Sequence, residues 1–471
     1  MSRYTSATPE DRAEMLAAIG VESSEELFEQ IPESLRLARP LALPPGISEA
    51  EVHERLAALA ARNVDAERQV CFLGAGMYDH YVPAIVDAIV QRSEFLTPYT
   101  PYQPEISQGG LQAMFEFQTM ISELTALPVA TAGLYEGPSS VASAGYLAIA
   151  ASGGRRRFVV SRGLHPHSRE TLATYSRGFG AEIAEVGLED GLTDATALAA
   201  AVGGGTAAVF LQSPNFLGAV EDVEALGAAA RQHGALLVVA CDPMTLGVLK
   251  PPGECGADIA LGEGQPLGNR LDFGGPSFGF FCGSEALLRK LPGRIAGETD
   301  DVDGRRGFVL ALQTREQHIR REKATHNICT AQALNALAAT IHLAWLGRGG
   351  FRELGELLVR RTAYAGERLA AVAGVELLHG APVARELALR LDAPVEAVLE
   401  RCAERGIAAG YALGREYPEH GDGLLVAITE RRSREQIDAL AEALGAAIAA
   451  ERGRLPVDTT DNRPVTQEAG R

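Results

Sequence analysis

Three chain segments, in order, carry side chains that could together hold a phosphorylated aromatic ring. Ser139 and Ser140 stand in a Gly-Pro-Ser-Ser sequence at the start of an expected helix, where hydroxyls and free backbone N–H groups favour phosphate binding. The imidazole of His165, just after an expected strand, could cover a flat ring. Asp242 follows the apolar run at residues 236–241, at the carboxyl edge where parallel sheets bind ligands, and a carboxylate there can keep a pyridinium nitrogen protonated. The ordered set predicts a pocket for pyridoxal phosphate (PLP).

The lysine that such a pocket requires is missing from its expected place. In a PLP enzyme of this layout the lysine that binds the cofactor lies in the loop after the strand expected at residues 258–261. That loop reads Gly-Glu-Gly-Gln-Pro-Leu-Gly and contains Gln265, whose amide cannot form an imine. Of the 43 basic residues only three are lysines, Lys250, Lys290 and Lys323, and none is in this loop. The sequence therefore predicts a fold of the PLP type without PLP chemistry on this chain.

Each of these features also has a plainer interpretation. The two serines could cap a helix, the histidine could be a buried structural residue, and Asp242 could cap the turn that it begins. The run Gly74-Ala-Gly76 opens like a dinucleotide-binding turn, but Asp79 stands where a third glycine is required, which favours an ordinary tight turn. A cofactor site is favoured only because the serines, His165 and Asp242 occur in this order along the chain.

The elements that would position these residues follow an alternating pattern. Short apolar runs alternate with helical patterns, which predicts a mostly parallel sheet covered by helices. The expected strands are residues 158–161, 182–186, 207–212, 236–241, 258–261 and 278–282. Long helices are expected at residues 325–346 and 349–372, followed by the strands and helices of a compact α+β domain.

The predicted organisation of the chain has four parts. They are an N-terminal helical arm at residues 1–65, a large α/β domain at 66–325, long helices with a smaller C-terminal α+β domain at 326–452, and a flexible tail at 453–471. The arm is expected to be helical at residues 9–19, 23–30 and 48–62.

The composition excludes several classes of protein. The formal net charge of −18 opposes binding to nucleic acid or to an anionic membrane. No apolar run is long enough to span a membrane, and the polar start of the chain lacks the apolar core of a signal peptide. The six cysteines are scattered without zinc-binding spacing, so no metal site is expected and a reducing cytoplasm fits best.

Long literal strings in this chain resemble the N-terminal (alpha) subunit of the two-chain bacterial glycine dehydrogenase (decarboxylating), the P-protein of the glycine cleavage system. The most specific strings are residues 99–109 (YTPYQPEISQG), 115–120 (FEFQTM), 262–268 (GEGQPLG) and 314–324 (TREQHIRREKA). A small departure is His326, where the resemblance leads us to expect a small polar residue.

The resemblance implies an aminotransferase-like architecture, the PLP-dependent transferase fold of type I, in an α2β2 assembly. It implies that the homologous beta subunit carries the PLP and its lysine, that Gln265 occupies about the place of that lysine here, and that no cofactor binds this chain. Ser139, Ser140, His165 and Asp242 would then be vestigial cofactor positions. The implied reaction joins glycine to PLP, releases CO2 and passes the aminomethyl group to the lipoyl arm of the H-protein.

The part of this chain in such an assembly would be to line the partner's active site. We expect the proline-interrupted loop to contribute Tyr99, Tyr102, Gln103 and Glu105, because two tyrosines and a glutamine can orient a carboxylate or line a lipoyl passage without ionising. The same loop could instead be a rigid subunit contact that touches no ligand.

The sequence is also compatible with two other functions. One is a self-sufficient PLP-dependent aminotransferase or decarboxylase that uses Lys250 or Lys290. The other is a non-catalytic regulatory scaffold of the same fold, which would bind the beta subunit or the H-protein.

Overall fold

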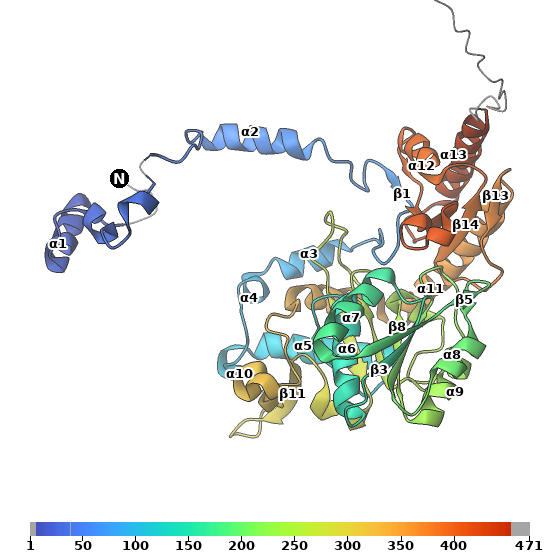
Figure 1. Ribbon diagram of the computed structural model, residues 1–471, viewed down its shortest axis with the longest axis horizontal. Helices are drawn as coiled ribbons and strands as arrows, with labels where there is room; N and C mark the ends of the chain where they lie inside the picture. The colour runs from blue at the N-terminus through green and yellow to red at the C-terminus, as the bar shows by residue number, and fades with distance from the viewer. Residues whose placement is uncertain (1–5, 38, 454–471) are drawn as a thin grey trace, which may run out of the picture. The chain divides into compact units, whose positions relative to one another are not determined.

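The computed structural model describes residues 6–37 and 39–453 (Figure 1). Contacts within the chain separate it into two compact units, with the boundary between Val64 and Asp65. Apart from Gly453, the predicted tail at residues 453–471 lies outside the described residues. The further division of the second unit at residue 325 stays a prediction.

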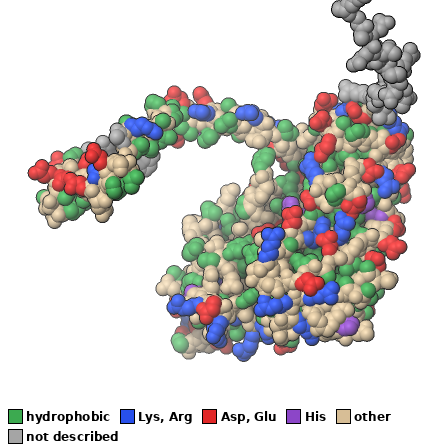
Figure 2. Space-filling view, viewed as in Figure 1, with side chains coloured by type: hydrophobic (Ala, Val, Ile, Leu, Met, Phe, Trp, Pro, Cys, Tyr) green, Lys and Arg blue, Asp and Glu red, His purple; other side chains and the backbone are tan. Residues whose placement is uncertain are grey.

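The first unit consists of short helices with no interior. Its helices are α1 (Pro9–Ile19), α2 (Glu49–Ala60) and two 3-10 turns, Ser24–Phe28 and Glu33–Leu35. Both α-helices begin with a capping box, in which Thr8 or Ser48 exchanges hydrogen bonds with the residue three positions later. Of the described residues of this unit none is buried, and green hydrophobic side chains lie on its surface in Figure 2. Capping and backbone hydrogen bonds within the helices therefore hold them, whereas a packed face normally contributes most of the stability of a helix.

The second unit is built on a seven-stranded sheet. In spatial order its strands are β2 (Val129–Ala130), β10 (Gly279–Gly283), β9 (Ile259–Glu263), β8 (Leu236–Cys241), β7 (Thr206–Ser213), β3 (Arg157–Ser161) and β4 (Glu182–Val186). The five strands from β9 to β4 are parallel, and β10 is antiparallel to both of its neighbours. The six strands expected from the sequence, and the mostly parallel sheet, are confirmed.

Alternating side chains of these strands enter cores on the two faces of the sheet, because successive residues of a strand point to opposite faces. On one face Phe158, Phe210 and Phe281 belong to a core that includes residues of α6 and α7. On the other face Val159 and Val209 pack under α8 and α9, while α5 and α11 cover β9 and β10. These helices are α5 (Gln108–Thr125), α6 (Gly137–Ala151), α7 (Pro166–Phe179), α8 (Ala195–Ala201), α9 (Val223–His233) and α11 (Ala333–Ala370). The carboxyl edge of the sheet is left open between these layers.

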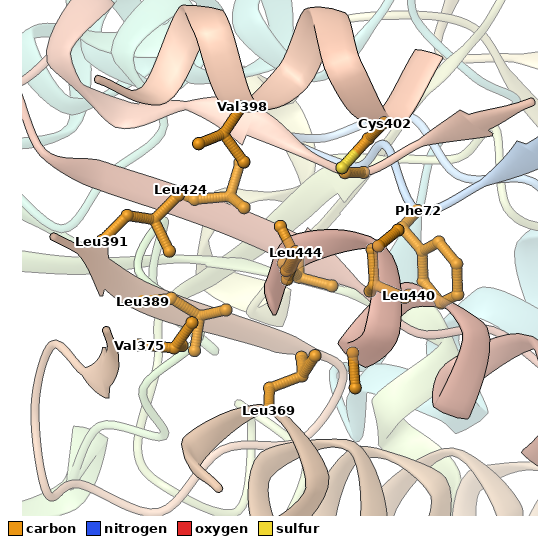
Figure 3. Close-up of a cluster of buried hydrophobic side chains, with 14 of the residues drawn as sticks. Phe72, Leu369, Val375, Leu389, Leu391, Val398, Cys402, Leu424, Leu440 and Leu444 are labelled. Atoms are coloured by element: carbon orange, nitrogen blue, oxygen red, sulfur yellow. The ribbon is translucent and has the colours of Figure 1, made fainter. Parts of the chain in front are cut away.

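A second, antiparallel sheet lies in the C-terminal part of the chain, as expected. Its strands are β13 (Val375–Leu377), β14 (Glu386–Leu391), β17 (Gly423–Ala427) and β16 (Tyr411–Ala412), and it packs against α12 (Val395–Ala403) and α13 (Arg434–Arg452). Figure 3 shows the core of this part, into which Phe72 also points. Phe72 arrives there because β1 (Val70–Cys71) pairs with β15 (Ile407–Ala408). This pairing anchors the segment that begins at residue 72 to the C-terminal part.

Two features differ from the sequence-based expectation. The hydrogen-bonded helix α11 begins at Ala333 and not at residue 325, and a φ of 60° at Gly347 interrupts it where the break between two helices was expected. The hairpin of β11 (Ile295–Asp300) and β12 (Arg306–Ala311) was not expected, because its outward half is polar. It is held by Phe308 and Leu310 against Leu111 of α5. Within the described residues no helix is both long enough and apolar enough to cross a membrane.

The buried core of the C-terminal sheet gives the first prediction. Leu444 of α13 is fully buried in this core (Figure 3), so Leu444→Ala should lower the free energy of unfolding by about 2–5 kcal/mol through lost burial and a residual cavity. Leu377→Ala, at a leucine that is 45% exposed, should change it by less than about 1 kcal/mol. Urea unfolding followed by circular dichroism measures both; equal losses would contradict this assignment of the core.

Candidate functional site

A cavity of about 380 Å³ opens at the carboxyl edge of the parallel strands. We call it the Asp242 cavity. The side chain of Asp242 follows β8, His165 stands at the start of α7, and the first turn of α6 forms another wall. Residues 75–78 and Arg385 also line it. The structure thus brings together three of the features that the sequence order suggested.

The start of α6 is not open to a phosphate, because it already binds carboxylates of this chain. The Glu136 carboxylate accepts hydrogen bonds from the backbone and the hydroxyl of Ser139, with an N–O distance of 2.9 Å. The Ser140 hydroxyl donates to the Glu136 carbonyl, and neither serine lines the cavity. Glu263, at the end of β9, accepts from the N–H of Gly137 at 3.1 Å. Helix N-termini favour anions, and here two carboxylates supply that negative charge.

Gln265 is fully buried beneath the cavity and has no free bonding capacity directed into it. Its Oε1 accepts from the backbone N–H of Tyr78 at 2.9 Å. Its Nε2 donates to the carbonyl oxygens of Tyr78 at 3.0 Å and of Asn269 at 2.7 Å. Both hydrogens of the amide and one lone pair of its oxygen are therefore used. Gln265 stands at the position where the sequence pattern requires a lysine. Its side chain instead holds the backbone of Tyr78 in place through two hydrogen bonds.

The carboxylate of Asp242 is paired within the chain. Its Oδ2 lies 2.6 Å from Nη2 of Arg385, whose side chain is only 2% exposed. Its Oδ1 accepts the backbone N–H of Met244 at 3.0 Å, so Asp242 also caps the turn that it begins. Burial acts to lower the pKa of Arg385, but Asp242, Tyr78 and Glu386 together outweigh it and the pKa is raised. The group that could stabilise a pyridinium nitrogen is neutralised by an arginine from the C-terminal sheet.

Arg385 is held in place by a chain of further contacts. Its guanidinium lies 3.3 Å from the ring centroid of Tyr78, a cation–π contact. Its Nη1 donates to Nε2 of His80 at 2.6 Å, and Nδ1 of His80 contacts the Glu430 carboxylate at 2.6 Å. Burial acts to raise the pKa of Glu430, but its contact with His80 and the hydrogen bond from the backbone N–H of Tyr81 together outweigh it and lower the pKa to about 2. Asp242, Arg385, His80 and Glu430 thus form one continuous polar network.

His165 is neutral and fixed in orientation. Burial lowers its pKa to about 4. Its Nε2 donates to the carbonyl oxygen of Ala75 at 2.8 Å, while its Nδ1 accepts the N–H of His167 at 3.1 Å. The backbone of Gly76, where φ is 102°, lies so close to the His165 ring that an added Cβ would be 2.8 Å from its Nε2. This position therefore requires glycine. The Gly-Ala-Gly turn, which the sequence favoured as an ordinary turn, therefore forms a wall of the cavity.

The residues of the proline-interrupted loop lie elsewhere. Tyr99 is 82% exposed at a separate cavity of about 500 Å³. The Tyr102 hydroxyl donates to the Glu316 carboxylate at 3.1 Å, and Gln103 and Glu105 are exposed. None of these four loop residues lines the Asp242 cavity.

No lysine of the chain lines the Asp242 cavity. Lys250 is paired with Glu224 at 2.7 Å on the surface. In the described part of the chain no group of three or more histidine, cysteine, aspartate or glutamate side chains could hold a metal ion.

The residues that sequence reasoning missed are Arg385, Tyr78, His80 and Glu386. Glu386 accepts hydrogen bonds from the Tyr78 hydroxyl at 2.8 Å and from the backbone N–H of Ala75 at 2.8 Å. The available signal was an Arg-Glu pair directly before the apolar run Leu-Ala-Leu, since adjacent charges at the start of a buried strand require partners.

The ion pair of Arg385 and Asp242 gives the second prediction. Arg385→Met should lower the free energy of unfolding by about 3–5 kcal/mol, because it leaves a partly buried carboxylate unpaired. Adding Asp242→Asn should recover most of this loss. Arg415→Met, which breaks an exposed pair with Glu396, is the matched control and should cost less than about 1 kcal/mol. Thermal and urea unfolding measure the stability of all three variants. If Arg385→Met were as stable as Arg415→Met, the pairing of Arg385 with Asp242 would be refuted.

Comparison with known proteins agrees with this geometry. A family model described as the glycine cleavage system P-protein matches residues 2–444. The probable glycine dehydrogenase (decarboxylating) subunit 1 of Moorella thermoacetica is 50% identical over 441 residues, covering 94% of this chain and 98% of that protein. The protein of the same description from Anoxybacillus flavithermus is 46% identical over 445 residues, covering 94% and 99%.

Solved structures give the same result. A crystal structure of glycine decarboxylase (P-protein) of the glycine cleavage system, in inhibitor-bound form, matches with a TM-score of 0.86 and 44% identity over 95% of this chain and 100% of that one. A sphingosine-1-phosphate lyase from Burkholderia pseudomallei, with a TM-score of 0.63 and 16% identity, shares the fold alone. The fold is that of the type I PLP-dependent transferases, as expected, and this chain belongs to the glycine cleavage system P-protein family.

Proposed function

We propose that this chain is subunit 1 of a two-chain glycine dehydrogenase (decarboxylating) and that it does not bind PLP itself. The description of its relatives as subunit 1 supports a partner subunit. The proposal that this chain does not bind PLP rests on the ion pair of Arg385 and Asp242. The Asp242 carboxylate that a PLP ring would need is already paired with Arg385.

The residues of the Asp242 cavity do not fit PLP at any of the three points that would hold it. Glu136 and Glu263 place negative charge where the phosphate would bind. Gln265 replaces the lysine and is fully engaged with the backbone. Asp242 is already paired with Arg385. The positions of the three lysines also disfavour a self-sufficient PLP enzyme, since none lines this cavity.

The partner, subunit 2, would carry the PLP, which when bound supplies the electron sink for decarboxylation of glycine. We propose an α2β2 assembly that passes the aminomethyl group to the lipoylated H-protein. In this assembly the contribution of the present chain is to bind the partner, to line its site and to exclude water from it. The six cysteines are all free, which fits a reducing compartment, and we propose a cytoplasmic location.

The loop at residues 99–106 supports the role as a wall of the partner's site. Tyr99 and Ile106 are 82% and 81% exposed, and Leu96 nearby is 55% exposed. Large apolar side chains gathered on a surface mark interaction sites. Tyr102 is fixed by its hydrogen bond to Glu316, so the loop presents a partly ordered aromatic surface.

The absence of cofactor binding is tested on the isolated full chain. After incubation with PLP and reduction by borohydride, mass spectrometry should find no stoichiometric pyridoxyl-lysine at any of the three lysines. Glycine-dependent exchange of CO2 should appear only when subunit 2 and lipoylated H-protein are added. Stoichiometric labelling of Lys250, Lys290 or Lys323 would overturn the proposal, and the reconstituted partner serves as the positive control for labelling.

The role of the loop is tested in the reconstituted complex. Tyr99→Ala should lower the rate of glycine-dependent CO2 exchange by about tenfold, because orientation at the site depends on its walls, while the subunits still assemble. Tyr175→Ala, at a tyrosine of α7 that is 49% exposed, is the matched control and should leave the rate unchanged. Size-exclusion chromatography checks assembly. An unchanged rate of CO2 exchange in Tyr99→Ala would show that the loop does not contribute to catalysis.

A further inference from the structure

Several polar groups that line the Asp242 cavity have no partner in the described part of the chain. The cavity lies at the carboxyl edge of the parallel strands, where ligands of such sheets bind, and its volume of about 380 Å³ is that of a small-molecule site. The unpaired groups fall into two sets, carboxylates at one end and uncharged donors at the other. Together these sets define the kind of ligand that the cavity accepts.

The first set consists of the carboxylates of Glu136 and Glu263. Oε1 of Glu136 accepts the backbone N–H of Ser139, whereas its Oε2 is not buried and has no hydrogen-bond partner among the described residues. Glu263 accepts hydrogen bonds from backbone N–H groups, which are uncharged. The one arginine of the lining, Arg385, is paired with Asp242. Burial raises the pKa of Glu263 and the charge of Glu136 raises it further, so a cationic group beside them would be stabilised.

The second set consists of Gln212, near the end of β7, and Ser168, in the first turn of α7. Oε1 of Gln212 accepts the backbone N–H of His165 at 2.9 Å, which fixes the amide and leaves Nε2 as a free donor. Ser168 is only 5% exposed. Neither Nε2 of Gln212 nor Oγ of Ser168 is sealed in the interior, and in the part of the chain that the structure describes neither makes a hydrogen bond. Both residues line the cavity, so these donors are available to a ligand in it.

The order of the strands separates the two sets by about the reach of one α-amino acid. Gln212 lies on β7 and Glu263 on β9, with β8 between them. Neighbouring strands are about 4.8 Å apart, so the two sets stand roughly 10 Å from each other. In an α-amino acid the ammonium nitrogen lies about 3 Å from a carboxylate oxygen, and a hydrogen bond of about 2.9 Å at each end extends this to about 9 Å. The ion pair of Asp242 and Arg385, which follows β8, adds no net charge between the sets.

We propose that the Asp242 cavity binds a free α-amino acid in its zwitterionic form, with the ammonium group at Glu136 and Glu263 and the carboxylate at Gln212 and Ser168. The unpaired carboxylates disfavour a phosphate or another anion, and the free donors at the opposite end distinguish an amino acid from a simple amine. No lysine lines the cavity, so the amino acid binds without forming an imine and is not converted there. The site does not rest on the proposed function, since all of its residues belong to this chain.

The test is isothermal titration calorimetry of the full chain, with leucine and glycine as separate probes. Leucine is chosen because Met77, Val141 and Leu261 give the cavity an apolar wall, and glycine because it carries the two charged groups alone. We expect saturable one-to-one binding of at least one probe, with a dissociation constant of about 1 mM or tighter. Saturable binding of neither probe would overturn the proposal, since water would then satisfy the free groups.

Analogues that lack one charged group test the requirement for a zwitterion. For leucine they are 3-methylbutylamine, without the carboxylate, and 4-methylpentanoate, without the ammonium group. For glycine they are methylamine and acetate. Each analogue should bind at least about tenfold more weakly than its parent amino acid, the usual contribution of a charge-assisted hydrogen bond. An amine or an acid that binds as tightly as its parent would show that one end of the site makes no contact, which contradicts the proposal.

A substitution at the carboxylate end locates the binding. Glu136→Gln keeps an oxygen that can accept the N–H of Ser139 but removes the charge, and it should weaken binding by roughly ten- to a hundredfold. Glu170→Gln, at an exposed glutamate of α7 that does not line the cavity, removes the same charge elsewhere and should leave the affinity unchanged. Equal affinities in these two variants would overturn the proposal.

A pair of serines tests the donor end and keeps the test decisive if Glu136→Gln does not fold, which circular dichroism shows. Ser168→Ala should weaken binding by about three- to tenfold through the loss of one hydrogen bond. Ser176→Ala is the matched control, because Ser176 is a buried serine of α7 that has no partner among the described residues but does not line the cavity. It should leave binding unchanged. If the two variants bound with equal affinity, the carboxylate would not lie at this end and the proposal would fail.

Discussion

The buried ion pair of Arg385 and Asp242 is the interaction on which the arrangement of this molecule depends. A buried arginine is tolerated only with a charge partner and with its remaining donors engaged, and these requirements are met from three distant parts of the chain. Asp242 comes from the central sheet, Arg385 from the C-terminal sheet, and Tyr78 and His80 from the segment that β1 anchors. Each part is held by the other two, so the ion pair joins the two sheets as well as filling the site.

The same site combines the sheet edge at which ligands bind in open α/β sheets with side chains that already pair with one another. The strands, the first turn of α6 and the turn at Gly76 form the shape that a bound ring and phosphate would need. Two carboxylates of this chain already bind the helix N-terminus, and a guanidinium lies beside Asp242. Geometry therefore identifies the family, whereas the partners of individual side chains decide what the pocket can hold.

Sequence reasoning predicted the parts of the fold that depend on local periodicity. The six strands, the break near Gly347 and the placing of His165 and Asp242 at one sheet edge follow from patterns within a few residues. The adjacent charges of Arg385 and Glu386 before an apolar run indicate only that partners are needed. Which residues those partners are could not be found in this way, since Asp242 and Tyr78 are more than 140 positions away. The hairpin of β11 and β12 was missed for a related reason. Its outward half is polar, and its buried residues are covered by α5 and by the core of the large sheet, so its alternation is weak when it is considered alone.

The first unit has a consequence for the lifetime of the chain. None of its described residues is buried, so its backbone amides exchange with solvent and its peptide bonds are open to proteases whenever nothing covers it. A chain of this kind is most vulnerable while it is unassembled. The described residues of this unit are therefore where proteolysis should cut the folded chain first.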